Sequence, residues 1–167
     1  MIGQGAHLPR FRGRSQHGEE ITDADLAGRP ALLLFYPYAF SPVCGSELRE
    51  IAVRRCEFAQ VGARLLAISC DSAHSLRAYA EQLSASVAAE ETRGPTDETE
   101  LGFTMLSDFW PHGEIASAFG AFDESRGVPR RASFFVDAAG TIRAVQAAEF
   151  HQRRDVGQTL ALLRALS

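Results

Sequence analysis

The sequence contains no lysine, and all 17 of its basic residues are arginine. Lysine is therefore excluded as a nucleophile. Runs of basic residues are also missing and the net charge is −4, so the chain offers no positive field for nucleic acid. The longest apolar run, residues 31–36, is far too short to cross a bilayer. We expect neither nucleic acid nor a membrane as a partner.

Cysteine is scarce, with three residues in the chain. An odd number, without an apolar signal segment in residues 1–14, argues against a disulfide scaffold and for the reducing cytoplasm. In that setting a conspicuous cysteine is more often reactive than structural. The five histidines show no metal-ligand spacing and no Gly-rich nucleotide loop occurs, so we expect no metal or other cofactor.

The chain does contain apolar runs that alternate with helix-like segments, which predicts an α/β domain. A length of 167 residues and a hydrophobic fraction of 46% suit one globular domain, residues 1–167. Strands are predicted at residues 31–36 and 64–69, and a hairpin at 133–137 and 141–145. Helices are predicted over residues 43–60, 72–83, 113–119 and 158–166. The acidic stretch 84–100 is interpreted as an insertion forming a solvated surface loop.

Cys44 occupies a position that favours chemistry. Pro37 ends the first predicted strand and Pro42 begins the next helix, so Cys44 should lie in the first helical turn. Backbone N–H groups and the positive end of the helix dipole stabilise a thiolate there. The thiolate is the nucleophilic form of cysteine.

The spacing around this cysteine narrows the interpretation. Pro37, Ser41, Cys44 and Glu47 form the pattern Pro-x-x-x-Ser-x-x-Cys-x-x-Glu, which resembles the active-site signature of the peroxiredoxin family. The segment 130–137, Arg-Arg-Ala-Ser-Phe-Phe-Val-Asp, resembles the second signature of that family, with an arginine ahead of a Phe-rich strand.

Further segments extend the resemblance over nearly the whole chain outside 84–100. Residues 5–11 are loosely similar to the N-terminal run of the family, and residues 67–72 to its Ser-x-Asp-Ser strand end. Residues 106–113, Leu-Ser-Asp-Phe-Trp-Pro-His-Gly, look most like the one-cysteine, AhpE-type peroxiredoxins of actinobacteria.

The resemblance implies a thioredoxin-like fold with a central mixed sheet and a thiol peroxidase activity. Cys44 would attack the peroxide and become a sulfenic acid. Arg131 would stabilise the thiolate and orient the peroxide, and Glu47 would orient that arginine. Ser41 would hydrogen-bond sulfur and peroxide, and Pro37 would shield the thiolate. Hydrogen peroxide, alkyl hydroperoxides and peroxynitrite all remain possible substrates.

Simpler functions remain open for most of these residues. Ser41 could be only a helix cap, and Glu47 is favoured in a first helical turn by the dipole alone. Pro37 could merely end the strand. Arg130 and Arg131 are adjacent in an extended segment, so only one of them can face the site; the spacing favours Arg131.

The reduction of oxidised Cys44 could involve another cysteine of the chain or an external thiol. Cys56 lies twelve residues after Cys44 on the same predicted helix, about 18 Å along its axis, too far for a disulfide. Cys70 is the other candidate, although a buried strand position is the simpler interpretation of it. We therefore expect a one-cysteine mechanism, with a reductant of the mycothiol/mycoredoxin or thioredoxin type, and a homodimer. The alternatives are a peroxide sensor or redox relay, or a thiol–disulfide oxidoreductase on the same fold.

Overall fold

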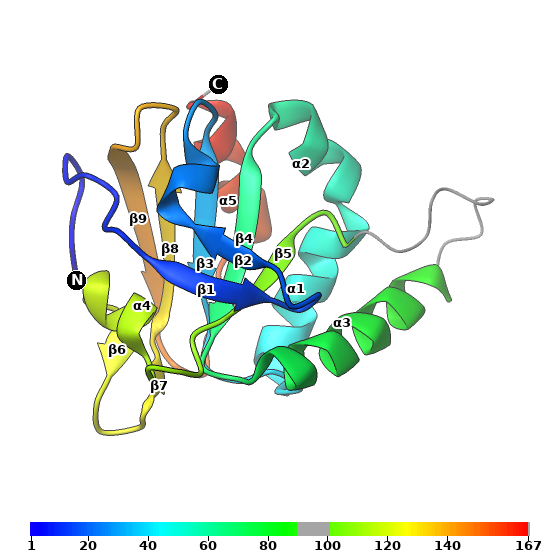
Figure 1. Cartoon of the computed structure of the whole chain (residues 1–167). Helices are drawn as coiled ribbons and strands as arrows, with labels where there is room; N and C mark the ends of the chain where they lie inside the picture. The colour runs from blue at the N-terminus through cyan, green and yellow to red at the C-terminus, as the bar shows by residue number, and fades with distance from the viewer. Residues whose placement is uncertain (90–100, 167) are drawn as a thin grey trace.

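A mixed seven-stranded sheet forms the centre of the molecule in the computed structural model, which describes residues 1–89 and 101–166 (Figure 1). The strand order is β2-β1-β5-β4-β3-β8-β9, with β3, β4 and β5 parallel to one another. The strands are β1 (Arg12–Ser15), β2 (Glu20–Thr22), β3 (Ala31–Phe35), β4 (Arg64–Ser69), β5 (Thr104–Ser107), β8 (Arg131–Val136) and β9 (Ile142–Ala148). A separate two-stranded ribbon consists of β6 (Phe122–Asp123) and β7 (Val128–Pro129).

Helices cover both faces of the sheet (Figure 1). They are α1 (Pro42–Val53), α2 (Arg55–Val61), α3 (Ala73–Ala88), α4 (Glu114–Ala118), α5 (Val156–Arg164) and the 3-10 helix η1 (Asp23–Leu26). Side chains of β3 alternate between two cores, as the pleat requires. Leu32 and Leu34 pack with α1, α2, α3 and α5, whereas Leu33 and Phe35 pack with η1 and α4. The α/β fold with a mixed sheet is thus confirmed.

The predicted strands and the hairpin are confirmed, but one helix is not. The segment 43–60 is not a single helix, because it breaks at Arg54, where φ is −92° and ψ is 16°. The break redirects the chain so that Phe58 of α2 reaches the same core as Leu48 and Ile51 of α1. The prediction that Cys44 and Cys56 lie on one helix, about 18 Å apart along its axis, is therefore wrong.

The helix predicted to end at residue 83 continues to Ala88. Leu83 and Val87 are both buried and extend the apolar side of α3, so the residues 84–88 are helical rather than part of a loop. The rest of the acidic stretch, from residue 90 to 100, lies outside the described residues. Within the described residues, no helix combines the length and apolar character needed to span a membrane.

The resemblance implied added strands at the N-terminus, as β1 and β2 are. The positions of β1, β2 and β5 were not predicted, because they are three or four residues long and carry little periodic pattern. Packing between neighbouring strands determines where they form. Gly13 in β1 illustrates it: a Cβ atom there would lie 2.8 Å from Cγ of Leu106, so only glycine fits against β5.

Asp108 joins this part of the sheet to α4. Its two carboxylate oxygens accept hydrogen bonds from the backbone N–H groups of Ile115, at 2.8 Å, and Ala116, at 2.9 Å. Burial raises the pKa of Asp108 to about 6, although both hydrogen bonds act in the opposite direction.

Asp108 should make stability depend on pH. Between pH of about 4 and 6 the unfolded carboxyl is ionised while the folded one still holds its proton, so stability falls as pH rises through this window and is level above it. We expect the free energy of unfolding of wild type minus that of Asp108→Asn to fall by up to about 3 kcal/mol across the window. Urea unfolding at several pH values measures it, and a constant difference would contradict the prediction.

Candidate active site

Cys44 lies in the first turn of α1, as predicted. Pro42 occupies the first position of the helix, and Ser41 caps it with a side-chain oxygen that accepts a hydrogen bond from the Cys44 backbone N–H at 3.3 Å. The cysteine side chain is buried, with 1% of its surface exposed. Its sulfur is thus held at the helix N-terminus by the local sequence alone.

Arg131 reaches this sulfur because of the strand pairing. β8 runs antiparallel to β3 with Ala132 opposite Phe35, so β8 begins where β3 ends and α1 follows. The Nη2 group of Arg131 donates a hydrogen bond to Cys44 Sγ at 2.9 Å. Arg131 is buried with 1% exposure, whereas its neighbour Arg130 is exposed. The structure therefore brings Arg131, and not Arg130, to Cys44.

Glu47 lies one helical turn beyond Cys44 and bridges two arginines. Its Oε2 accepts a hydrogen bond from Arg131 Nη1 at 2.8 Å, and its Oε1 accepts one from Arg154 Nε at 2.6 Å. All three side chains are almost fully buried. Such charge-assisted pairs fix both guanidinium groups in position.

Arg154 was not among the predicted site residues. It precedes α5, and its Nη1 group donates to the backbone oxygen of Phe35 at 2.9 Å and to Ser133 Oγ at 3.3 Å. Burial lowers the pKa of Arg154, and the charge of Glu47 opposes that effect. The only sequence signal for it is that it belongs to one of three adjacent arginine pairs, and no spacing argument distinguishes the pair of Arg153 and Arg154 from a surface feature.

The cluster beside the Cys44 sulfur has a net positive charge. Arg131, Arg154 and Glu47 together carry one positive charge, which a thiolate at Cys44 would neutralise. Because the cluster is buried, water screens these charges little. The arrangement is suited to holding a nucleophilic thiolate and a peroxide oxygen at the same guanidinium.

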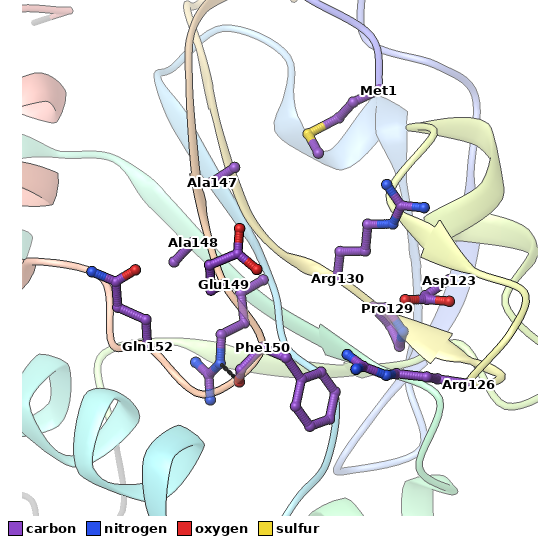
Figure 2. Close-up of a pocket in the computed structure, with 11 residues that line it drawn as sticks. Met1, Asp123, Arg126, Pro129, Arg130, Ala147, Ala148, Glu149, Phe150 and Gln152 are labelled. Atoms are coloured by element: carbon purple, nitrogen blue, oxygen red, sulfur yellow. Dashed lines mark hydrogen bonds between the residues drawn. The ribbon is translucent and has the colours of Figure 1, made fainter.

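Phe150 supports Arg131 from the loop after β9 (Figure 2). Its backbone oxygen accepts a hydrogen bond from Arg131 Nε at 2.9 Å. Its ring packs edge-on against Tyr38, with centroids 6.0 Å apart, and the Arg126 guanidinium lies 4.3 Å from the ring centre. Phe150 is a second residue that the sequence did not reveal, because the contact with Arg131 is made by a backbone atom.

The remaining candidates have different surroundings. Pro37 is buried at the end of β3, and Ser41 makes the capping contact described above. Cys56 is exposed on α2, while Cys70 is buried after β4. Burial, reinforced by the carboxylates of Asp108 and Asp71, raises the pKa of the Cys70 thiol to about 12. Cys70 is therefore held as a neutral thiol.

Within residues 1–89 and 101–166, no group of three or more His, Cys, Asp or Glu side chains could hold a metal ion.

The family model of the AhpC/TSA family matches residues 4–145, most of the chain. This protein belongs to the peroxiredoxins of the AhpC/TSA family. It is 32% identical to alkyl hydroperoxide reductase E of Mycobacterium tuberculosis over 158 residues, 93% of this chain and 92% of that protein. A putative peroxiredoxin in the rubredoxin operon of Clostridium pasteurianum is 28% identical and covers 99% of this chain and 88% of its own length. The peroxiredoxin is thus a thiol peroxidase, an oxidoreductase.

Solved structures agree with this assignment. Peroxidoxin BcpB from Mycobacterium tuberculosis superposes with a TM-score of 0.81 at 26% identity, covering 100% of this peroxiredoxin and 99% of that chain. Enterococcus faecalis AhpC gives a TM-score of 0.83 at 24% identity, covering 99% and 92%, and supports the thioredoxin-like fold.

Glu47→Gln should destabilise this peroxiredoxin strongly. The substitution removes the charge that two buried guanidinium groups share, which costs about 3 kcal/mol of unfolding free energy. Urea unfolding of reduced protein measures the loss. Glu50→Gln is the matched control on the same helix, because Glu50 pairs with Arg153 and Arg54 at the surface and should cost at most about 1 kcal/mol. Equal losses in the two variants would contradict the bridging function of Glu47.

Proposed function

We propose that this chain reduces peroxides through Cys44 by a one-cysteine mechanism, with Arg131 holding the thiolate and orienting the peroxide. The observation that carries the proposal is the hydrogen bond of 2.9 Å between Arg131 Nη2 and Cys44 Sγ inside a buried cluster of net positive charge. A guanidinium fixed by a carboxylate can stabilise charge on sulfur and on the departing oxygen without rearranging.

The first step is a displacement at oxygen. The Cys44 thiolate attacks one peroxide oxygen, so that an S–O bond forms while the O–O bond breaks. The departing alkoxide or hydroxide takes up a proton and leaves as an alcohol or water, and the sulfur becomes a sulfenic acid. Arg131 stabilises the negative charge as it moves from sulfur to oxygen, and Glu47 and Phe150 keep its guanidinium in place.

Ser41 and Pro37 complete the proposed site. Ser41 holds the backbone of Cys44 by capping α1, and its hydroxyl would donate a hydrogen bond to the peroxide. Pro37 is buried where β3 ends and shields the thiolate from water. Both functions rest on the proximity of these residues to Cys44 in the chain and on the resemblance of the motif.

We further propose that an external thiol or redoxin, of the mycothiol/mycoredoxin or thioredoxin type, reduces the sulfenic acid. The neutral, buried state of Cys70 and the exposed position of Cys56 on a different helix support this choice. The proposed substrates are hydrogen peroxide, peroxynitrite and alkyl hydroperoxides. The name of the relative from Mycobacterium tuberculosis, alkyl hydroperoxide reductase E, supports the last of these.

A homodimer in the cytoplasm remains our proposal for the assembled protein. Phe109 and Trp110 follow β5 and expose 54% and 84% of their surfaces. Large aromatic side chains of this kind are enriched at interfaces between protein chains.

The assignment of Cys44 is tested by stopped-flow fluorescence and intact mass after one equivalent of peroxide. Wild type and Cys70→Ser should form one sulfenic acid that dimedone traps, and Cys44→Ser should form none, because only Cys44 is held beside Arg131. If wild type resists dimedone and requires Cys70, the protein resolves its own sulfenic acid. Fast oxidation followed by slow turnover with every reductant would favour a peroxide sensor or relay.

Arg131→Met should slow oxidation of Cys44 by about 100-fold, because it removes a preorganised charge from the transition state. The rate constant is measured under pseudo-first-order peroxide. Arg143→Met is the control, since Arg143 is exposed on β9 and pairs with Asp137 away from the site. A rate within twofold of wild type in Arg131→Met would exclude the proposed function of that residue.

A further inference from the structure

A cavity of about 450 Å³ opens beside Arg131, between the end of β9 and the β6–β7 ribbon (Figure 2). Its volume falls in the range of sites for small organic molecules, and hydrogen peroxide would leave it almost empty. Arg131 and Phe150 both line it. The cavity therefore adjoins both Arg131, whose guanidinium contacts the reactive sulfur, and Phe150, whose backbone oxygen helps to hold that guanidinium.

Two of the charged side chains in the cavity are already engaged. Asp123 accepts hydrogen bonds from the Ser125 backbone N–H, at 3.1 Å, and hydroxyl, at 2.6 Å. Arg126 lies over the ring of Phe150. Asp123 thus has its partners within the chain, and Arg126 is placed against an aromatic ring.

Arg131 is engaged too, with Phe150, Glu47 and Cys44. Arg130 and Glu149 are the two charged side chains of the lining that remain. Both line the cavity, both are exposed, and within residues 1–89 and 101–166 neither side chain makes a hydrogen bond or an ion pair. Figure 2 shows them on opposite sides of the cavity, Arg130 beside β7 and Glu149 at the end of β9. A cavity with one free guanidinium and one free carboxylate facing it matches a molecule that carries both a carboxylate and an ammonium group.

We propose that this cavity binds the α-amino-acid end of a small thiol that reduces the Cys44 sulfenic acid. The carboxylate of the thiol pairs with Arg130 and its ammonium group with Glu149. This inference rests on the proposed one-cysteine function. Cys44 does not itself line the cavity, so the thiol group must reach past Arg131. A γ-glutamyl thiol, in which several bonds separate the amino-acid group from the sulfur, has that form.

The bound thiol reduces the sulfenic acid through a mixed disulfide. The sulfur of the bound thiol attacks the sulfur of Cys44, so an S–S bond forms and the S–O bond of the sulfenic acid breaks. The hydroxyl leaves with the thiol proton as water. A second thiol molecule then attacks the mixed disulfide and releases reduced Cys44.

Glutathione and 2-mercaptoethanol are suitable probes, one with the amino-acid end and one without. Full-length protein is oxidised with one equivalent of hydrogen peroxide and mixed with either thiol, and the loss of sulfenic acid is followed by stopped flow. The readout is the ratio of the two rate constants, in which the intrinsic reactivity of Cys44 cancels. We expect Arg130→Gln and Glu149→Gln each to lower this ratio by about tenfold, the loss of one charge-assisted contact.

Arg10→Gln and Glu81→Gln are the matched controls, because both residues are exposed and neither lines the cavity. They should leave the ratio unchanged. An unchanged ratio in both cavity variants overturns the inference. So does a slowing of Cys44 oxidation by hydrogen peroxide in these variants that equals their loss in the ratio. If neither thiol reduces the wild-type sulfenic acid, both this inference and the proposed reduction by an external thiol fail. If 2-mercaptoethanol alone reduces it, only the proposed binding of an amino-acid thiol in the cavity fails.

Discussion

The carboxylate of Glu47 is the charge on which the candidate site depends. It accepts hydrogen bonds from Arg131 at the start of β8 and from Arg154 ahead of α5, and it lies one turn from Cys44 on α1. Three segments far apart in the chain thus meet at one buried anion. Two guanidinium groups without it would face each other in an apolar interior, which is strongly unfavourable. The same contact therefore stabilises the fold and directs Arg131 Nη2 at the sulfur.

The sheet makes this meeting possible. Antiparallel pairing of β8 with β3 puts the first residues of β8 at the carboxyl end of β3, where α1 begins. The pleat of β8 then sends Arg131, Ser133 and Phe135 to the face that α1 and α5 cover. Arg130 precedes β8, is exposed and lines the cavity together with Arg131. One peptide unit thus separates an arginine that contacts the sulfur from one that is free to contact a ligand.

The three cysteines show how strongly surroundings control thiol chemistry. Cys44 lies at a helix N-terminus beside a guanidinium. Cys70 is buried near two carboxylates, and Cys56 is exposed to solvent. Only the first environment places a buried positive charge in a fixed direction at the sulfur. A thiol with a pKa near 12 is a poor partner for a sulfenic acid, so the environment of Cys70 argues for recycling by an outside molecule.

The sequence by itself determined the α/β class, the buried strands and the place of Cys44 in a first helical turn, because these follow from local patterns. Arg131 was expected at the site only from the resemblance of its segment to a known family. The sequence did not determine the break at Arg54, the short strands β1, β2 and β5, Arg154 or the carbonyl of Phe150. Each of these depends on packing between distant segments or on a backbone atom that carries no sequence signature. The tertiary structure alone decides which of several arginines is buried beside a carboxylate, since that choice is made by strand pairing and not by residue type.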